Sequence, residues 1–217
     1  LYAFKRFKDV GLGKDTVSVD QNRAELILEA QRLVQLGWFY SEFERRARSG
    51  NVQIETLRVT EYLLAFELTP REKDPSVASG YKDVDIDIVD VPMTWLMEPF
   101  RPRESVKWSG TNQHPSHANS AVGSTVNAFA HFVYATSFGM IGVADIQTSH
   151  ARVGDTGANV MFDLTTHTTD GNSGVGDHGP DGLKTFREEH QCVLRCNKLN
   201  LGDLVDPNAT GLDSDDD

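Results

Sequence analysis

The stretch FREEHQCVLRC, residues 186–196, holds a histidine and both cysteines of this 217-residue chain. Cys192 and Cys196 are four residues apart, which places them on one face if the stretch is helical, and His190 can join them from the helix start. Zinc prefers four nitrogen or sulfur ligands in a tetrahedron. We therefore expect a zinc site here, with a fourth ligand from one of the other histidines. Two buried thiols in a helical core are the alternative.

The composition is that of a globular protein, with 39% hydrophobic and 24% charged residues. The length fits one domain or one two-lobed unit. A net charge of −11 argues against a nucleic-acid partner, because basic patches supply that affinity. The sequence contains no apolar run of about 18 residues, so no membrane span is predicted. Two cysteines make no disulfide framework, which favours a reducing, cytoplasmic compartment.

The hydrophobic pattern predicts an α+β fold. Alternation of apolar and polar residues indicates strands, and apolar residues at helical spacing indicate helices. Gly37 is expected to break the first helix in two, and the acidic run 82–91 is either an insertion or an edge strand. Strands are expected at 1–8, 59–68, 93–100 and 139–147, and helices at 20–48, 126–137 and 180–201, the last as one helix or two.

Two lobes are expected from this element order. The N-terminal lobe covers 1–98 and is expected to lack its first strands, since the chain starts at Leu1 within a strand. The C-terminal lobe covers 99–202. Residues 203–217 form an acidic tail with the composition of a disordered segment.

The last segment resembles the end of the atypical alpha-kinase catalytic domain, the family of myosin heavy chain kinases, elongation-factor kinase and channel-kinases. In that family a helix carries H-x-C-x-x-x-C, and a histidine in a segment like AFSHFTY completes a zinc site. Here AFAHFVY, residues 128–134, precedes ADIQ, residues 144–147. The resemblance implies a two-lobed, protein-kinase-like alpha-kinase fold, with a structural zinc in the C-terminal lobe held by His131, His190, Cys192 and Cys196.

The first strand, LYAFKRF, resembles the family's YVAKRF, which implies that Lys5 holds nucleotide phosphates. Taken alone, Lys5 is an ordinary exposed strand lysine. LMEPF, residues 96–100, is similar to the hinge segment, so Glu98 is expected beside the adenine. Glu29 is expected to pair with the lysine. SVKWSGTN, residues 105–112, resembles the family's Y-x-K-x-N-x-N stretch only in part.

Asp145 and Gln147 alternate at a predicted strand end and therefore point to the same side. Their oxygens suit Mg²⁺, which prefers hard oxygen ligands. On the residues alone, two polar side chains that cap a strand are the better explanation of the pattern. The resemblance instead implies phosphoryl transfer from Mg-ATP, with Asp145 catalytic and Gln147 at the cation.

Two aspartates compete for a second catalytic position. FDLTTHT, residues 162–168, resembles the family's TDPQIHT and implies that Asp163 lies near the magnesium and the acceptor hydroxyl. Asp155 has the family's spacing from the first aspartate instead. Choosing Asp163 requires an insertion, which we expect to be a loop formed by SHARVGDT, residues 149–156. Thr148 and Leu164 replace a glycine and a proline that are usual in the family, which leaves activity open.

The stretch GVGDHG, residues 174–179, reads G-x-G-x-x-G but does not open a βαβ unit, so a dinucleotide site is not expected. It resembles the alpha-kinase loop that is linked to peptide-substrate binding. Gly174, Gly176 and Gly179 would let the backbone approach a substrate closely and adopt positive φ.

The resemblance implies a serine/threonine protein kinase that uses ATP, Mg²⁺ and a structural Zn²⁺. Its partner would be a protein substrate, and the acidic charge favours a basic one. A pseudokinase with the same fold and little transfer is the first alternative. A zinc-stabilised interaction module is the second, but it would leave Asp145, Asp163 and the glycine loop unexplained.

Overall fold

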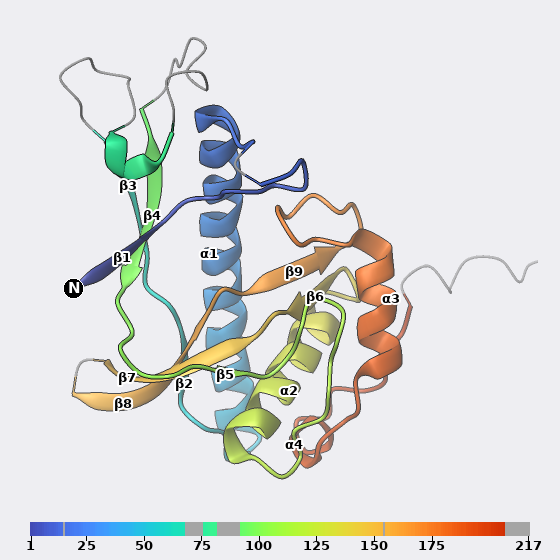
Figure 1. Cartoon of the computed structure of the whole chain (residues 1–217). Helices are drawn as coiled ribbons and strands as arrows, with labels where there is room; N and C mark the ends of the chain where they lie inside the picture. Colours follow the sequence, from blue (N-terminus) through green and yellow to red (C-terminus); the bar gives the residue numbers. More distant parts are fainter. Residues whose placement is uncertain (15, 68–75, 82–91, 154, 207–217) are drawn as a thin grey trace, which may run out of the picture. The chain divides into compact units, whose positions relative to one another are not determined.

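The computed structural model describes residues 1–14, 16–67, 76–81, 92–153 and 155–206 (Figure 1). The chain forms two compact units. Unit 1 comprises Leu1–Val34 and Thr60–Pro102, and unit 2 comprises Gln35–Val59 and Arg103–Asp217. The lobe limits at residues 98 and 202 stay predictions. The acidic run 82–91 and most of the predicted tail, from residue 207, lie outside the described residues.

Helix α1, Val19–Ser49, contributes its first half to unit 1 and its second half to unit 2. It starts with a reciprocal cap, because the backbone N–H of Gln21 donates to the Ser18 hydroxyl and the Ser18 N–H donates to the Gln21 side chain. The predicted break at Gly37 is wrong, and the helix continues through it. Among the described helices, none is both long and apolar enough to cross a membrane.

Unit 1 contains a three-stranded antiparallel sheet in the order β1-β4-β3. Its strands are β1 (Tyr2–Lys5), β3 (Leu63–Phe66) and β4 (Thr94–Pro99), and a short 3₁₀ helix, η1 (Val77–Ser79), follows β3. Ala3 pairs with Glu98 and Lys5 pairs with Leu96. Because side chains alternate along a strand, Lys5 and Glu98 therefore share one face of this sheet.

Unit 2 contains a four-stranded sheet in the order β2-β8-β7-β5 and a two-stranded sheet, β6-β9. The predicted strand 59–68 is thus two strands, since β2 lies in unit 2 and β3 in unit 1. The predicted loop at 149–156 is also wrong for most of its length, because residues 149–153 and Thr156 belong to the paired strands β7 and β8. The strands are β2 (Leu57–Val59), β5 (Val106–Lys107), β6 (Ile141–Ala144), β7 (Gln147–Val153), β8 (Thr156–Phe162) and β9 (Thr165–Thr168).

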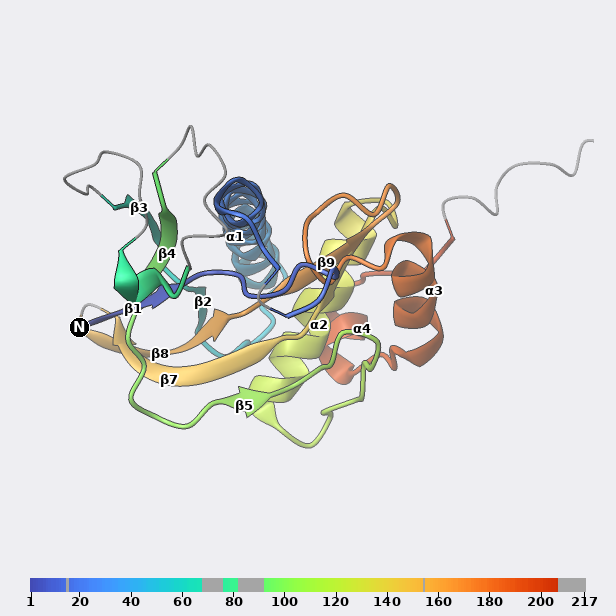
Figure 2. The ribbon, with the colours of Figure 1, turned by 45° about the horizontal axis from the view of Figure 1, so that its top comes forward.

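Three helices complete unit 2, namely α2 (Ala121–Thr136), α3 (Gly179–Glu189) and α4 (Leu194–Lys198). Helix α2 packs on β6 and α4, and α3 packs on β9 and β6 (Figure 2). Phe43 of α1 lies against Phe129 and Phe132 of α2, with ring centroids 5.6 and 5.5 Å apart. Residues 180–201, predicted as one helix or two, form two helices with a link between them.

The aromatic contact between α1 and α2 predicts a large loss of stability when the Phe43 side chain is truncated. Phe43 is 0% exposed, so Phe43→Ala removes its packing and leaves a cavity. We expect the free energy of unfolding in urea to fall by about 3–5 kcal/mol. The matched control is Phe138→Ala, at a position that is 80% exposed, where we expect little change. Equal losses for the two variants would contradict this account of the core.

Candidate functional site

The strand pairs β6–β9 and β7–β8 form one antiparallel ladder with a single interruption. Ala144 pairs with Thr165 on one side of it, and Gln147 pairs with Phe162 on the other. Two residues on each strand separate these pairs, Asp145–Ile146 on one strand and Asp163–Leu164 on the other. At the interruption, two unpaired segments therefore lie opposite each other, and each of them starts with an aspartate.

Both aspartates adopt the left-handed conformation, with φ of 52° at Asp145 and 51° at Asp163. Non-glycine residues rarely adopt this conformation, and such residues concentrate at functional sites. Ile146 and Leu164, which follow the two aspartates, are buried. The left-handed turns thus point the apolar residues into the core and leave Asp145 half-buried and Asp163 exposed.

Asp155 lies in a different place. It lies at the tip of the β7–β8 hairpin, directly before Thr156, its side chain is fully exposed, and it contacts Arg152 at 3.4 Å. Asp163 instead follows β8 at the base of the same hairpin, on the strand opposite Asp145. The geometry therefore favours Asp163 over Asp155 as the partner of Asp145.

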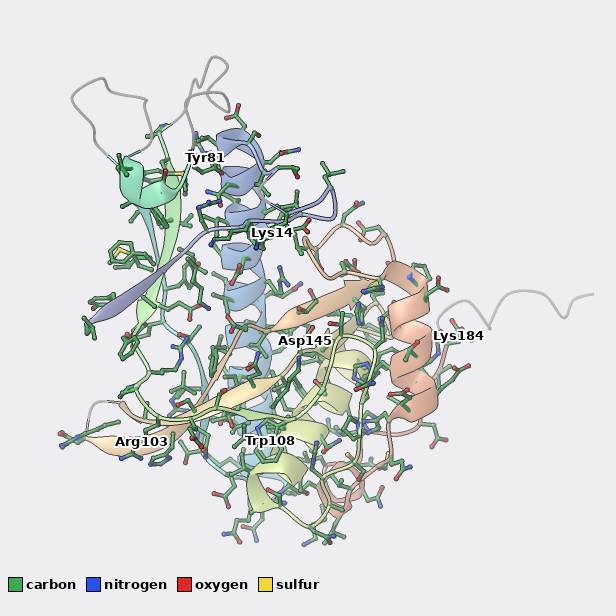
Figure 3. All side chains as sticks on the ribbon, viewed as in Figure 1. Lys14, Tyr81, Arg103, Trp108, Asp145 and Lys184 are labelled. Carbon is green, nitrogen blue, oxygen red and sulfur yellow. The ribbon has the colours of Figure 1, made fainter. Side chains whose placement is uncertain are left out.

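Two side chains from the segment before α2 hold the carboxylate of Asp145. Lys107 Nζ lies 2.8 Å from Oδ1, and the Thr111 hydroxyl donates to Oδ2 at 2.5 Å. The Asp145 side chain is 16% exposed and faces this segment (Figure 3). Gln147 opens β7, half-buried, and pairs with Lys107 in the sheet. Our sequence reasoning noticed the stretch 105–112 but assigned no role to Lys107 or Thr111.

Unit 1 holds a second charged cluster around Glu98, whose side chain is 1% exposed. Lys5 Nζ lies 3.1 Å from Glu98 Oε1, and the Arg101 guanidinium contacts Oε2. Arg101 also donates to the Thr60 hydroxyl at 3.0 Å. Two cations thus neutralise a buried carboxylate, as burial of a charge requires. Sequence reasoning identified Lys5 and Glu98 but not Arg101. Glu29 lies half-buried on α1.

The four predicted zinc ligands come together. Ligand atoms of His131, His190, Cys192 and Cys196 all lie within 4.8 Å of one another. Cys192 Sγ lies 3.5 Å from His131 Nδ1, and Cys196 Sγ lies 3.9 Å from His190 Nε2. Tetrahedral zinc with bonds of about 2.0–2.3 Å separates its ligand atoms by roughly 3.3–3.8 Å, so the cluster has the right size.

The backbone around the cysteines differs from the expectation. His190 is the C-cap of α3, and Cys192 lies in the link before α4, so the two cysteines do not share a helix face. Burial lowers the pKa of His190 to about 4 and raises the pKa of Cys196 to about 11. Burial also lowers the pKa of His131. The imidazoles are therefore neutral at pH 7, which is the form that binds metals.

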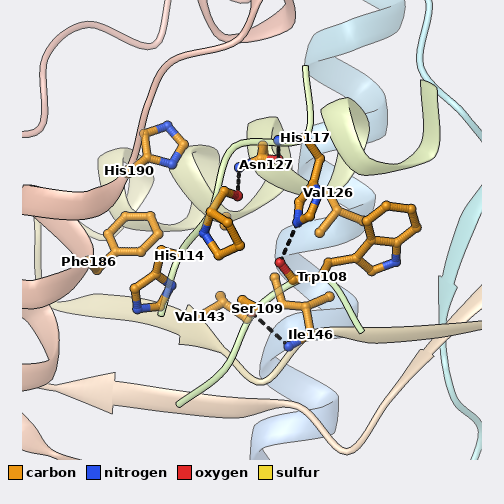
Figure 4. Close-up of a pocket in the computed structure, with 12 residues that line it drawn as sticks. Trp108, Ser109, His114, His117, Val126, Asn127, Val143, Ile146, Phe186 and His190 are labelled. Carbon is orange, nitrogen blue, oxygen red and sulfur yellow. Dashed lines mark hydrogen bonds between the residues drawn. The ribbon is translucent and has the colours of Figure 1, made fainter. Parts of the chain in front are cut away.

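A small cavity of about 20 Å³ lies beside this cluster (Figure 4). Trp108, His114, Phe186 and His190 are among its lining residues. The volume suits one water molecule rather than a substrate. Burial lowers the pKa of His114 to about 4, so this imidazole is also neutral. The cavity therefore belongs to the packing around the cluster and is not a substrate site.

The glycine-rich segment 174–179 forms a loop whose three glycines all adopt positive φ, at 108° for Gly174, 88° for Gly176 and 59° for Gly179. Asp177 holds this loop from inside. Its carboxylate accepts hydrogen bonds from Thr168 and from the backbone N–H groups of Ser173 and Gly179. Burial alone would raise the pKa of Asp177, but these hydrogen bonds outweigh it and the pKa is lowered.

His167 of β9 is fully buried beneath this loop, and α3 is shaped around its ring. A Cβ atom at Gly182 would lie 2.3 Å from His167 Cγ, closer than real contacts allow. Glycine in a helix interior costs about 1 kcal/mol relative to alanine. Gly182 therefore accommodates the imidazole at the expense of helix propensity.

Both a protein family and a known kinase match the sequence of this chain. A model of the alpha-kinase family matches residues 2–197. Alpha-protein kinase 1 of Dictyostelium discoideum is 34% identical over 99 residues, which is 45% of this chain and 7% of that protein.

Among solved structures, the apoenzyme alpha-kinase domain of myosin-II heavy chain kinase A superposes with a TM-score of 0.61 at 21% identity, covering 83% of this chain and 61% of that one. The same kinase's domain in complex with AMPPCP gives a TM-score of 0.58 at 21% identity, covering 83% and 59%. The structural likeness shows the fold, and the chain spans about three fifths of these solved domains. The predicted alpha-kinase resemblance is confirmed.

The fit between Gly182 and His167 makes a prediction about two helix glycines. Gly182→Ala should destabilise the protein by about 1–3 kcal/mol, because the added methyl group displaces the buried ring. Gly37→Ala adds a methyl group that meets nothing within 4 Å, and it should stabilise α1 by about 1 kcal/mol. Urea denaturation measures both changes. Opposite signs are expected, and a stabilised Gly182→Ala would refute the close packing.

Proposed function

Because the chain belongs to the alpha-kinase family, we propose that it transfers the γ-phosphate of ATP to serine or threonine hydroxyls of a protein. The observation that carries this proposal is the pair of left-handed aspartates, Asp145 and Asp163, at the interruption of the ladder. Myosin heavy chain kinase A domains have been solved in complex with AMPPCP and with ATP, which supports ATP as the donor here.

Phosphoryl transfer needs bound phosphates, an oriented hydroxyl and charge stabilisation, and little covalent chemistry. Asp163 is exposed and offers its carboxylate to Mg²⁺ and to the acceptor hydroxyl. Gln147 offers an amide oxygen, and both groups are hard oxygen donors of the kind that Mg²⁺ selects. Asp145 is held by Lys107 and Thr111 and is the second catalytic carboxylate.

The nucleotide would bind through unit 1. Lys5 carries the positive charge for the phosphates, and its present partner is Glu98. Glu98 lies at the end of β4, where we place the adenine-binding hinge. Glu29 on α1 is the proposed carboxylate that orients Lys5 in the nucleotide-bound protein.

We propose a structural zinc at His131, His190, Cys192 and Cys196. The donor set and the spacing of its atoms fit zinc, and four protein ligands leave no open position for chemistry. The ion would join α2 to the link between α3 and α4. Both thiols are free, which fits a reducing, cytoplasmic location.

The loop with Gly174, Gly176 and Gly179 is the proposed contact for the protein substrate. All three glycines adopt positive φ, which glycine reaches without strain, and Gly174 and Gly176 are half-buried whereas Gly179 is buried. Asp170 and Asp181 are exposed on either side of it, which favours a basic peptide. This charge supports the expectation of a basic substrate.

A pseudokinase is the second candidate, and a specific observation favours it. Thr148 replaces the usual glycine after Gln147, and its side chain is buried and accepts a hydrogen bond from Trp108 Nε1 at 2.8 Å. Leu164 replaces the usual proline after Asp163 and is buried. These changes surround both aspartates, so the fold and nucleotide binding could persist with little transfer.

Labelled γ-phosphate transfer to a basic protein tests the kinase. The wild type should transfer, and Asp163→Asn should lose activity by at least a hundredfold, because a general base typically contributes 10²–10⁴-fold. Asp155→Asn is the matched control and should retain activity. An inactive Asp155→Asn with an active Asp163→Asn would show that the insertion was placed wrongly. A folded wild type that binds Mg-ATP without transfer would establish the pseudokinase.

Metal analysis and unfolding test the zinc. The purified protein should hold one zinc per chain, and His190→Ala and Cys192→Ser should lose it and melt at lower temperature, since metal binding is coupled to folding. His150→Ala changes an exposed histidine outside the cluster and should keep the metal. A metal-free protein with the wild-type melting temperature would refute a structural zinc.

A further inference from the structure

The geometry points to His167 as a positioning residue that holds Asp145 through Thr111. This inference rests on the proposed phosphoryl transfer, in which Asp145 is a catalytic carboxylate. His167 itself does not touch Asp145. Its effect would be transmitted by one peptide carbonyl and one hydroxyl of the same residue, Thr111.

The first step is the hydrogen bond between Thr111 and Asp145. An ionised carboxylate only accepts, so the Thr111 hydroxyl donates to Asp145 Oδ2. Lys107 occupies Oδ1 but is itself mostly exposed, with a flexible stem. Thr111 is half-buried and branched at Cβ, which restricts its rotamers. The orientation of the carboxylate therefore depends chiefly on where the backbone of Thr111 lies.

The second step is the hydrogen bond that fixes that backbone. His167 Nε2 lies 2.7 Å from the carbonyl oxygen of Thr111. The backbone N–H of His178 donates to His167 Nδ1 at 3.1 Å. Since Nδ1 accepts, Nε2 must carry the proton in the neutral ring, and it donates to Thr111. The tautomer that holds Thr111 is thus set by a peptide group of the loop before α3.

Other hydrogen bonds hold the residues on either side of Thr111, which lies in the turn between Gly110 and Gln113. The Asp145 N–H donates to the Gly110 carbonyl, and the Gly110 N–H donates to Gln113. The His114 N–H donates to Glu189. Further back, His117 Nε2 binds the Trp108 carbonyl and Ser109 accepts from Ile146 (Figure 4). Within the part of the chain that the structure describes, His167 is the residue that binds the Thr111 carbonyl.

A buried histidine with two hydrogen bonds could equally serve packing alone. Two observations point beyond packing. The acceptor is the carbonyl of the one residue whose hydroxyl binds Asp145 Oδ2. The ring also requires glycine at position 182, so the chain gives up helix propensity to keep an imidazole in this place. Leucine would fill a similar volume without the N–H.

The experiment compares His167→Leu, which removes the donor, with His167→Gln, whose amide nitrogen reaches a similar position. We expect His167→Leu to lower kcat by about ten- to a hundredfold, the effect of a misplacement near 1 Å, with little change in KM for ATP. His167→Gln should recover most of the lost kcat. Thr111→Val should resemble His167→Leu.

The double variant distinguishes positioning from packing. If His167 acts through Thr111, His167→Leu combined with Thr111→Val should be no slower than the slower single variant. If the two substitutions only damaged the structure independently, the double variant would show the product of the two reductions in kcat. Multiplied losses, or a His167→Gln variant as slow as His167→Leu, would overturn the inference while leaving the kinase intact.

Hydrogen exchange separates failure of this inference from failure of the proposed function. The amides of 110–113 should exchange faster in His167→Leu than in the wild type, whether or not the protein transfers phosphate. A wild type without transfer would refute the proposed kinase activity. Faster amide exchange in His167→Leu would still establish that His167 holds the backbone of Thr111. Unchanged amide exchange would overturn the inference that His167 holds Thr111, whether or not the protein is active.

Discussion

One antiparallel ladder determines the arrangement of the candidate site. The pairs Ala144–Thr165 and Gln147–Phe162 keep the same register on both sides of the interruption. Side chains in a ladder alternate, so a slip of one residue on either strand would reverse which side each carboxylate faces. Two residues are lost from pairing on each strand, and the left-handed φ of Asp145 and Asp163 absorbs the break. The positions of the two aspartates are thus fixed together.

Two helices of unit 2 pack on the β6–β9 part of this ladder. Helix α2 packs on β6, and α3 packs on β9 and β6. The histidine and cysteine cluster joins α2 to the segment after α3, so the same two helices are joined a second time by polar ligands. The cluster's contribution to activity would come from keeping the helices in place on the strands, which is the role expected of a closed metal site.

Sequence patterns predicted the parts of the structure that depend on local chemistry. The spacing of the first helix, the four converging histidine and cysteine side chains and the glycine loop are all present in the structure. Gly37 was misjudged because the helix around it buries Leu36, Phe39 and Tyr40, and this burial exceeds the roughly 1 kcal/mol that glycine costs. Local propensity gave no indication of that packing.

The contacts that were missed join residues distant in sequence. Thr111 and Asp145 are 34 residues apart, and His167 and Thr111 are 56 apart. Neither threonine nor a lone histidine carries a spacing signal, so these roles follow only from the folded backbone. The strands at 149–156 were read as a loop because polar residues and a glycine dominate them. Their pairing with each other, rather than their composition, makes them strands.

The lengthened hairpin also bears on how such chains should be aligned with one another. Extra residues at its turn extend both strands outward and leave the base pairing unchanged, so chain length there can vary without moving Asp163. Counting residues from Asp145 by the family's spacing leads to Asp155, whereas following strand partners across the ladder leads to Asp163, the residue of the proposed site. In a sequence alignment of this region, gaps should be placed at the hairpin turn. Residues of two chains correspond when they have the same partner across the ladder.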